Sequence, residues 1–271
     1  MKYTLILLFV LNLLYSQKIE FPDNYNKPLA TISYDVLDTS NLNVFYKVSF
    51  IEPLKDKRKE AICLLEIGSK VVKFQDYNSL KYDSILMNLK NVTPQVQVNE
   101  LLKYRINWKN IVLSENGKIT IQDKAFKMFE YEDNSVLFDW KISSEKKIIS
   151  NYNCNKATTI FRGRNYTAWF TNQIPLSNGP FVFRGLPGLI LEISDDDSEF
   201  SFEMIGLNKD VKNIYKKTNK NIIKTTREKF RTAQKSFLDN PSFYFGDSYD
   251  NDGSTQIQKP KKSKYNLLEI E

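Results

Sequence analysis

From residue 28 to residue 206, strand signals dominate, mostly as alternation of apolar and polar residues. Ala30, Ile32 and Tyr34 occupy every second position, and the stretch from 44 to 50 repeats the habit. A period of two places the apolar side chains on one face of a β-strand, whereas a helix needs a period of about 3.6. The sequence therefore predicts a mainly β protein.

Turn residues between these segments predict hairpins. AICLLEI (61–67) is followed by Gly68-Ser69 and VVKF, and Asn116-Gly117 separates two further apolar runs. Asn-Gly is the strongest short hairpin signal. A third hairpin is expected to turn over the charged run SSEKK (143–147). Residues 81–90 fit either a short helix or a strand, and the rest predicts an antiparallel meander.

One helix is indicated clearly, over residues 226–238. TTRE (225–228) supplies a capping box, Phe230, Ala233 and Phe237 share one face, and Asn240-Pro241 ends the pattern. We expect this helix to pack across a single large, curved antiparallel sheet or half-barrel. The architecture resembles the open barrels of envelope carrier proteins, a likeness of shape alone.

The two ends of the chain differ from the middle. Residues 1–16 place Lys2 before an apolar run and end in a small residue, which is typical of a secretory signal peptide. Residues 17–245 then form one β-rich domain, and 246–271 form a polar tail expected to be flexible. Nothing downstream of the signal peptide resembles a transmembrane segment. We expect an exported protein of the periplasm or outer cell envelope.

The chain contains no histidine, and its only cysteines are Cys63 and Cys154. The lack of histidine excludes Ser-His-Asp and Cys-His catalysis and the histidine-liganded zinc hydrolases. We predict no metal, no cofactor and no catalytic residues. The two cysteines can pair in an oxidising compartment or remain buried thiols, and the sequence leaves both interpretations open.

Positive charge gathers late in the chain. Between Lys209 and Lys235 ten Lys or Arg residues stand against Asp210 and Glu228. Such a segment can be a solvated surface or can meet an anionic partner such as lipid headgroups or polysaccharide. For an exported protein, nucleic acid is not an expected partner.

The stretch from Cys154 to Ile193 is dense in aromatic residues, Arg, Gly and Pro. KATTIF (156–161) and YTAWFT (166–171) bracket RGRN, which predicts two strands joined by a tight turn. Tyr166, Ala168 and Phe170 form the expected core face, and Trp169 lies on the other.

Two more reversals follow in the same stretch. Leu186-Pro187-Gly188-Leu189 has the residues of a type II turn, with Pro at the first central position and Gly at the second. DDDS (195–198) makes a second, acidic turn. Its adjacent carboxylates are expected to point in different directions, which argues against a calcium site.

The hexapeptide GLPGLI (185–190), with AWFT (168–171), Ile174-Pro175 and Gly179-Pro180 upstream, resembles the GLPGLI family of exported bacterial proteins. Looser agreement extends over most of the chain, including the signal peptide. The resemblance implies an envelope protein of unassigned biochemical function, often described beside outer-membrane transport systems. No catalytic residues carry over from it.

Arg162, Arg164 and Trp169 are the candidate ligand contacts. Guanidinium groups bind carboxylates or phosphates, and an indole stacks on flat groups or cations. The alternative is structural: the arginines satisfy turn carbonyls, and Trp169 fills a groove in the sheet.

Three functions remain open from the sequence. The leading hypothesis is a non-enzymatic binding or chaperone-like module for a hydrophobic ligand or an extended peptide. The second is a structural partner of an outer-membrane transport protein. The third is a hydrolase that relies on carboxylates such as Asp139, Glu192 and Glu203, which requires two of them about 5 to 10 Å apart in one pocket.

Overall fold

The computed structural model describes residues 32–52, 57–88, 93–134, 136–218 and 221–244. Within these ranges the chain forms a sheet of thirteen strands, in the order β13-β6-β5-β4-β3-β2-β1-β11-β10-β9-β8-β7, with β12 paired to β1 beside that path. The predicted signal peptide (1–16) and polar tail (246–271) lie outside the described residues.

The strands are β1 (Tyr34–Glu52), β2 (Lys57–Gly68), β3 (Val71–Asp76), β4 (Ile111–Glu115), β5 (Lys118–Lys124), β6 (Met128–Glu132), β7 (Lys141–Ile149), β8 (Tyr152–Phe161), β9 (Arg164–Thr171), β10 (Leu189–Asp195), β11 (Phe200–Asn208), β12 (Asn213–Lys217) and β13 (Ile223–Thr226). Their pairing is antiparallel except for β13, which runs parallel to β6.

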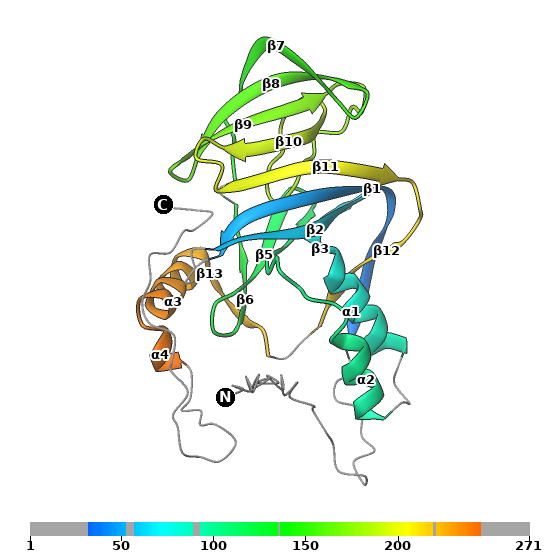
Figure 1. The fold of residues 1–271 in the computed structure, drawn as a ribbon, viewed down its shortest axis with the longest axis vertical. Helices are drawn as coiled ribbons and strands as arrows, with labels where there is room; N and C mark the ends of the chain where they lie inside the picture. Colours follow the sequence, from blue (N-terminus) through cyan, green and yellow to red (C-terminus); the bar gives the residue numbers. More distant parts are fainter. Residues whose placement is uncertain (1–31, 53–56, 89–92, 135, 219–220, 245–271) are drawn as a thin grey trace, which may run out of the picture.

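The sheet curves around one hydrophobic core, as predicted (Figure 1). Ile119 and Ile121 of β5 belong to the same buried cluster as Tyr166 and Phe170 of β9, although these strands stand far apart in the sheet order. The connection between β9 and β10 fills the space between them, with Phe183 only 1% exposed. The sheet does not close, so β13 and β7 remain its two edges.

All but one of the predicted hairpins are confirmed, including β8–β9 across the RGRN turn and β10–β11 across DDDS. β2 pairs with β3 across Gly68-Ser69, and β4 pairs with β5 across Asn116 and Gly117, whose φ angles are 50° and 82°. The prediction for SSEKK is wrong, because these residues lie inside β7. The chain turns instead at Ser150 and Asn151, with φ angles of 48° and 67°. A two-residue turn of this type needs positive φ at both positions, which Asn tolerates well.

The helix predicted over 226–238 is α3 (Arg227–Asp239). The Thr226 hydroxyl accepts a hydrogen bond from the Lys229 backbone N–H, and Phe230 stacks on Tyr131 with ring centroids 5.1 Å apart. Pro241 begins a further short helix, α4 (Pro241–Tyr244).

Two other helices, α1 (Tyr77–Asn88) and α2 (Pro94–Leu101), lie in the lower half of Figure 1, on the other side of the molecule from α3. The segment that fitted a helix or a strand is therefore helical, and α1 packs on β2 and β3. Among the described helices, none is long and apolar enough to cross a membrane.

The predicted type II turn at 186–189 is wrong. The glycine with positive φ is Gly185, at 98°, while Gly188 does not have the left-handed conformation that such a turn requires. Gly188 has another role: a Cβ on it would lie 2.1 Å from the carbonyl oxygen of Thr171. The backbone of β10 begins so close to the end of β9 that no side chain fits between them.

Candidate functional site

Arg162 lies in the turn between β8 and β9, Arg164 is the first residue of β9, and both bind carboxylates. Nη2 of Arg162 lies 2.5 Å from Oδ2 of Asp133, a side chain 2% exposed. Nη1 of Arg164 lies 2.7 Å from Oδ2 of Asp195 and 2.8 Å from Oε2 of Glu199. The first pair ties this turn to the chain after β6, so it helps to hold the curved sheet together.

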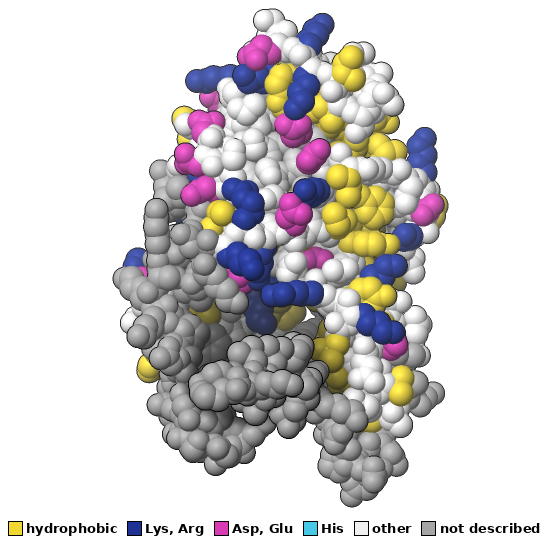
Figure 2. Space-filling model, in the orientation of Figure 1, with side chains coloured by type: hydrophobic (Ala, Val, Ile, Leu, Met, Phe, Trp, Pro, Cys, Tyr) yellow, Lys and Arg dark blue, Asp and Glu magenta, His cyan; other side chains and the backbone are white. Residues whose placement is uncertain are grey.

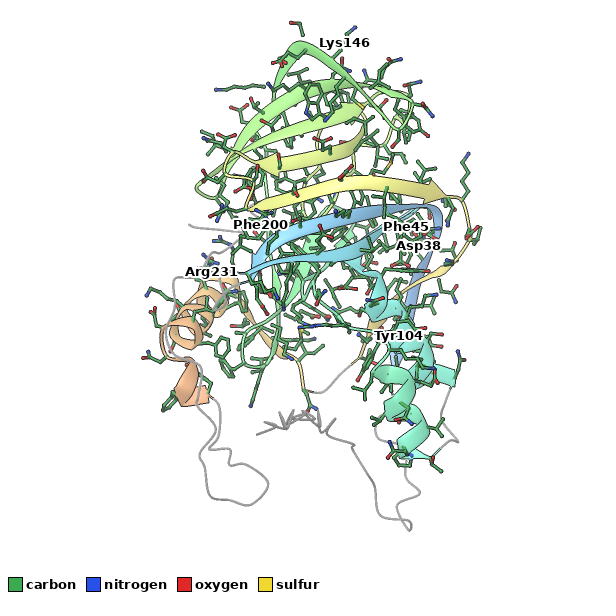
Figure 3. The ribbon with its side chains drawn as sticks, viewed as in Figure 1. Asp38, Phe45, Tyr104, Lys146, Phe200 and Arg231 are labelled. Atoms are coloured by element: carbon green, nitrogen blue, oxygen red, sulfur yellow. The ribbon has the colours of Figure 1, made fainter. Side chains whose placement is uncertain are left out.

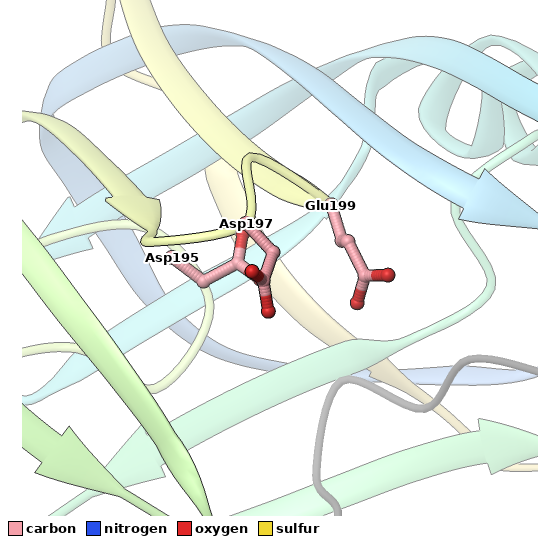
Figure 4. A group of neighbouring side chains, drawn as sticks. All are labelled: Asp195, Asp197 and Glu199. Atoms are coloured by element: carbon pink, nitrogen blue, oxygen red, sulfur yellow. The ribbon is translucent and has the colours of Figure 1, made fainter.

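Asp195 and Asp197, which were expected to diverge, gather with Glu199 around the β10–β11 turn (Figure 4), while Asp196 accepts a hydrogen bond from Asn165 at 3.1 Å. One carboxylate oxygen from each of the three gathered acids lies within 4.8 Å of the others. Burial raises the pKa of Asp195, while the Phe200 N–H and Arg164 oppose that rise. Because the Arg164 guanidinium compensates two of these carboxylates, the cluster is explained as a structural corner.

Trp169 lies apart from the two arginines, on the outer face of β9. It stands between Lys156 of β8 and Glu192 of β10 in the strand register. Nζ of Lys147 lies 5.4 Å from the ring centroid and 2.7 Å from a Glu192 carboxylate oxygen. The indole is half-buried beneath this ion pair. The three predicted contact residues therefore do not converge on one site, and ligand binding by them stays a prediction.

Cys63 and Cys154 are free, buried thiols. Cys63 lies on β2 and Cys154 on β8, five positions apart in the strand order. Neighbouring strands are about 4.8 Å apart, so the path between the two residues along the sheet is on the order of 20 Å, whereas a disulfide needs Cα atoms within about 7 Å. Of the two interpretations left open, the disulfide is not formed.

The concave side of the sheet, where a hydrophobic ligand was expected, is filled. Trp108 packs edge-on against Phe50, Phe181 and Phe202, with ring centroids 5.4 to 5.9 Å apart. The hollow that Phe74 and Phe183 line measures only about 30 Å³. This is room for a water molecule or two, not for a lipid chain.

Among the described hollows, none is lined by two of the three candidate carboxylates. Glu192 and Glu203 are register partners on β10 and β11, and each has a lysine beside it: Lys147 for Glu192 and Lys47 for Glu203. Asp139 precedes β7 and lines a hollow that contains neither glutamate.

The feature that sequence reasoning missed is the edge strand β7. Every residue from 141 to 148 is exposed, and β8 is its one neighbour among the described strands. Ile142 and Ile148 are 54% and 71% exposed, and Ile160 on β8 is 73% exposed. Figure 3 shows Lys146 at the far end of the molecule, away from the core. The lysines of SSEKK were the available signal, because lysine is common on edge strands.

A bulge divides β7 into two parts. Ile142 pairs with Ala157 and Lys146 with Asn155, so three residues of β7 face Lys156 alone. From Lys146 to Ile149 the ladder is regular. Beside the strand, a hollow of about 530 Å³ is lined by Asp139, Lys141, Thr158, Thr159, Ile160, Asn165, Tyr166, Thr167 and Asp196.

Comparisons with known proteins give one local match to a family model and two similar solved structures. A family model described as "Protein of unknown function (Porph_ging)" matches residues 161–192, the stretch from the end of β8 into β10. This match includes the hexapeptide but does not confirm the name of the GLPGLI family. No curated protein matches the chain.

Two solved structures, "Structure of PNGF-II in P21 space group" and "Structure of PNGF-II in C2 space group", are similar to 72% of the chain at 18% identity. Their TM-scores are 0.45 and 0.46. The chain spans only about a third of their length, 33% and 32%.

Proposed function

We propose that this protein is a non-enzymatic binding module of the cell envelope that takes a short extended peptide along β7. Of the two ligand classes expected from the sequence, the filled core argues against a hydrophobic molecule inside the sheet. The observation that carries the proposal is the exposed edge from 141 to 148, whose outer side pairs with none of the described strands. An edge strand offers a row of backbone N–H and C=O groups to an incoming strand.

The bulge favours a short peptide over a second copy of the same strand. A bulge bends and twists its strand, so a long flat partner cannot follow the whole of β7. The regular part, Lys146–Ile149, leaves room for a peptide of about four or five residues at about 3.4 Å each.

The charges of β7 favour an acidic peptide. Lys147 is paired with Glu192, and Glu145 with Lys156, in ion pairs of 2.7 and 2.9 Å. Lys141 and Lys146 are left as unpaired cations among the described residues. An acidic strand with apolar residues at alternate positions meets these cations and also covers exposed Ile148.

A fluorescent, end-capped pentapeptide of alternating glutamate and valine tests this proposal by anisotropy. We expect saturable binding that weakens at least tenfold when alternate peptide amides are N-methylated, because these can no longer donate to β7. An alternating lysine and valine peptide is expected not to bind. Equal binding of the methylated peptide would remove strand addition from consideration.

Two variants locate the contact. Lys146→Glu should weaken binding of the acidic peptide at least tenfold. Lys57→Glu makes the same charge change at the exposed start of β2 and should leave binding unchanged. If both variants weaken binding equally, the peptide responds to overall charge and not to β7.

The envelope location belongs to the same proposal, as does an outer-membrane protein as the source of the peptide. Its support is the sequence of residues 1–16. Fractionation of producing cells, with mass measurement of the purified chain, tests it. A cytoplasmic chain that retains Met1 to Ser16 would contradict export.

A further inference from the structure

Arg184 carries a positive charge that no described carboxylate compensates. It lies in the connection between β9 and β10, directly before Gly185, and it is partly buried. Its Nη1 donates to Oγ of Ser114 on β4 at 3.0 Å. A guanidinium has five N–H donors in a planar fork, so the others have no acceptor among the described residues. Arg162 and Arg164 differ from it, because each has a carboxylate partner.

Partial burial makes this lack of a partner unfavourable. Burial lowers the pKa of Arg184, because the charged form loses part of its contact with water. No neighbouring carboxylate among the described residues opposes that shift. A ligand with negative charge would supply the missing partner.

The backbone around Arg184 is held in place from both sides. Nε1 of Trp140 donates to the carbonyl oxygen of Arg184 at 2.8 Å, and the N–H of Gly185 donates to Oγ of Ser177 at 3.1 Å. The preceding residue, Phe183, is 1% exposed and belongs to the main core. The fold therefore presents the guanidinium from a fixed loop, which lowers the ordering cost of binding.

Arg184 and Ser114 line the same small hollow, which measures about 30 Å³ and lies on the concave side of the sheet. Val72, Ser114 and Ile119 lie side by side in the strand register and form one wall. Residues 178–184 form the facing wall. The lining contains no Asp or Glu, so the hollow itself offers Arg184 no internal anion.

The polar groups of the hollow are suited to a carboxylate. Its lining is apolar except for Ser114, Asn178 and Arg184. The Ser114 hydroxyl accepts from Arg184 and keeps its own O–H to donate, and the side-chain amide of Asn178 has no partner among the described residues. A carboxylate can accept from these donors while the apolar walls contact the carbon that carries it. The volume, room for about two water molecules, excludes a long chain.

We propose that Arg184, Ser114 and Asn178 form a binding site for a carboxylate that carries a small apolar group. The guanidinium and the hydroxyl hold the two oxygens, and the rest of the ligand extends out of the hollow. A free short-chain acid and the C-terminal residue of a peptide share this chemistry. The site does not depend on strand addition at β7, because no residue of β7 lines the hollow.

Ligand-observed NMR titration at pH 7 tests the proposal with propionate and with N-acetylalanine, which imitates a peptide C-terminus. We expect saturable binding of at least one acid, and the tighter of the two identifies the source of the carboxylate. N-acetylalaninamide lacks the charge and should not bind. No saturable binding of either acid, or binding of the amide as tight as that of N-acetylalanine, overturns the proposal.

A matched pair of variants separates the site from overall charge. Figure 2 shows Lys and Arg side chains spread over the visible face of the molecule, so the loss of one positive charge needs a control. Arg184→Met should weaken binding about tenfold or more, because the charge-assisted pair is lost. Arg105→Met makes the same change at an exposed arginine outside the hollow and should leave binding unchanged. Equal weakening by both variants would contradict a site at Arg184.

Two milder variants guard against misfolding. Arg184→Lys keeps the charge but loses the planar fork, and Ser114→Ala removes only the hydroxyl, so the fold should tolerate both. Each should weaken binding several-fold, and circular dichroism checks that all variants are folded. If Arg184→Lys and Ser114→Ala both bind as the wild type does, the carboxylate is not held at this hollow and the proposal is wrong.

Discussion

The close approach of β9 and β10 at Gly188 predicts an unusual response to substitution. Gly188→Ala places a Cβ 2.1 Å from the Thr171 carbonyl oxygen and 2.6 Å from its carbon. Both are backbone atoms, so no side chain can rotate away, and one strand must shift. Overpacking of a tight core costs about 1 to 3 kcal/mol, and a clash with backbone belongs at the upper end, about 3 kcal/mol.

Two other glycines serve as controls. Gly206 has open space around a built Cβ and no positive φ, so Gly206→Ala should be neutral or stabilise by up to about 1 kcal/mol. Gly117 also has open space but a φ of 82°, so Gly117→Ala should cost about 1 to 2 kcal/mol through backbone strain alone.

Urea unfolding measures all three variants. With an m value of about 2 to 3 kcal/mol per molar, Gly188→Ala should lower the midpoint by about 1 M or more. Asparagine separates the two causes, because it tolerates positive φ but is larger than alanine. Gly117→Asn should be milder than Gly117→Ala, and Gly188→Asn at least as harmful as Gly188→Ala. If Gly188→Asn destabilises the protein less than Gly188→Ala does, Gly188 is required for a turn with positive φ, and the packing explanation is wrong.

Three further predictions concern buried or anchored groups. Asp38 accepts hydrogen bonds from the N–H groups of Lys70 and Val71, at 2.7 and 3.0 Å, so Asp38→Ala should cost about 1 kcal/mol in urea unfolding after allowance for solvent screening. These bonds, chiefly that from Lys70, lower the pKa of Asp38 from 3.8 to about 2. The stabilisation that the Asp38 carboxylate provides is therefore complete above pH 4 and is lost as the pH falls toward 2. Between pH 4 and pH 2, Asp38→Ala should lose less stability than the wild type does. Arg162→Ala leaves the buried Asp133 carboxylate poorly compensated and should lower the free energy of unfolding by about 3 kcal/mol. The double variant with Asp133→Ala should recover part of that loss. If the double variant is less stable than Arg162→Ala alone, the ion-pair explanation is wrong. Burial raises the pKa of both cysteine thiols, so dithionitrobenzoate should label neither cysteine in the native protein. In urea without reductant it should label both. A disulfide would leave no thiol to label in urea.

The sequence predicts local structure well where one residue type has one physical role. Asn116-Gly117 turns because both residues tolerate positive φ, and Thr226 caps α3 because its hydroxyl reaches the Lys229 N–H. The alternation in β9 predicts its core face correctly: Tyr166, Ala168 and Phe170 are each at most 1% exposed.

The errors arise where one residue type has several roles. Gly188 fits a turn and also fits a close backbone approach, and the sequence alone cannot separate the two. SSEKK is polar like a loop, yet an exposed edge strand has the same composition. The partners of Arg162 and Arg164 depend on which distant strands the curved sheet brings together. The hollow that Lys73 of β3 lines likewise depends on β12, which lies against the side of β3 that faces away from the main core. No local sequence pattern reveals this position.

The position of β1 governs the order in which this chain can fold. β1 lies near the N-terminus but pairs with β2 on one side and with β11 on the other, so that Val48 faces Phe202. The β1–β6 meander forms from neighbouring segments, whereas the β1–β11 pairing must close a loop of most of the chain, which makes it slow. Until then β1 presents a long, unpaired and partly apolar edge to other chains. A chain shortened before β11 would keep that edge permanently, so aggregation and not partial activity is the expected fate of such fragments.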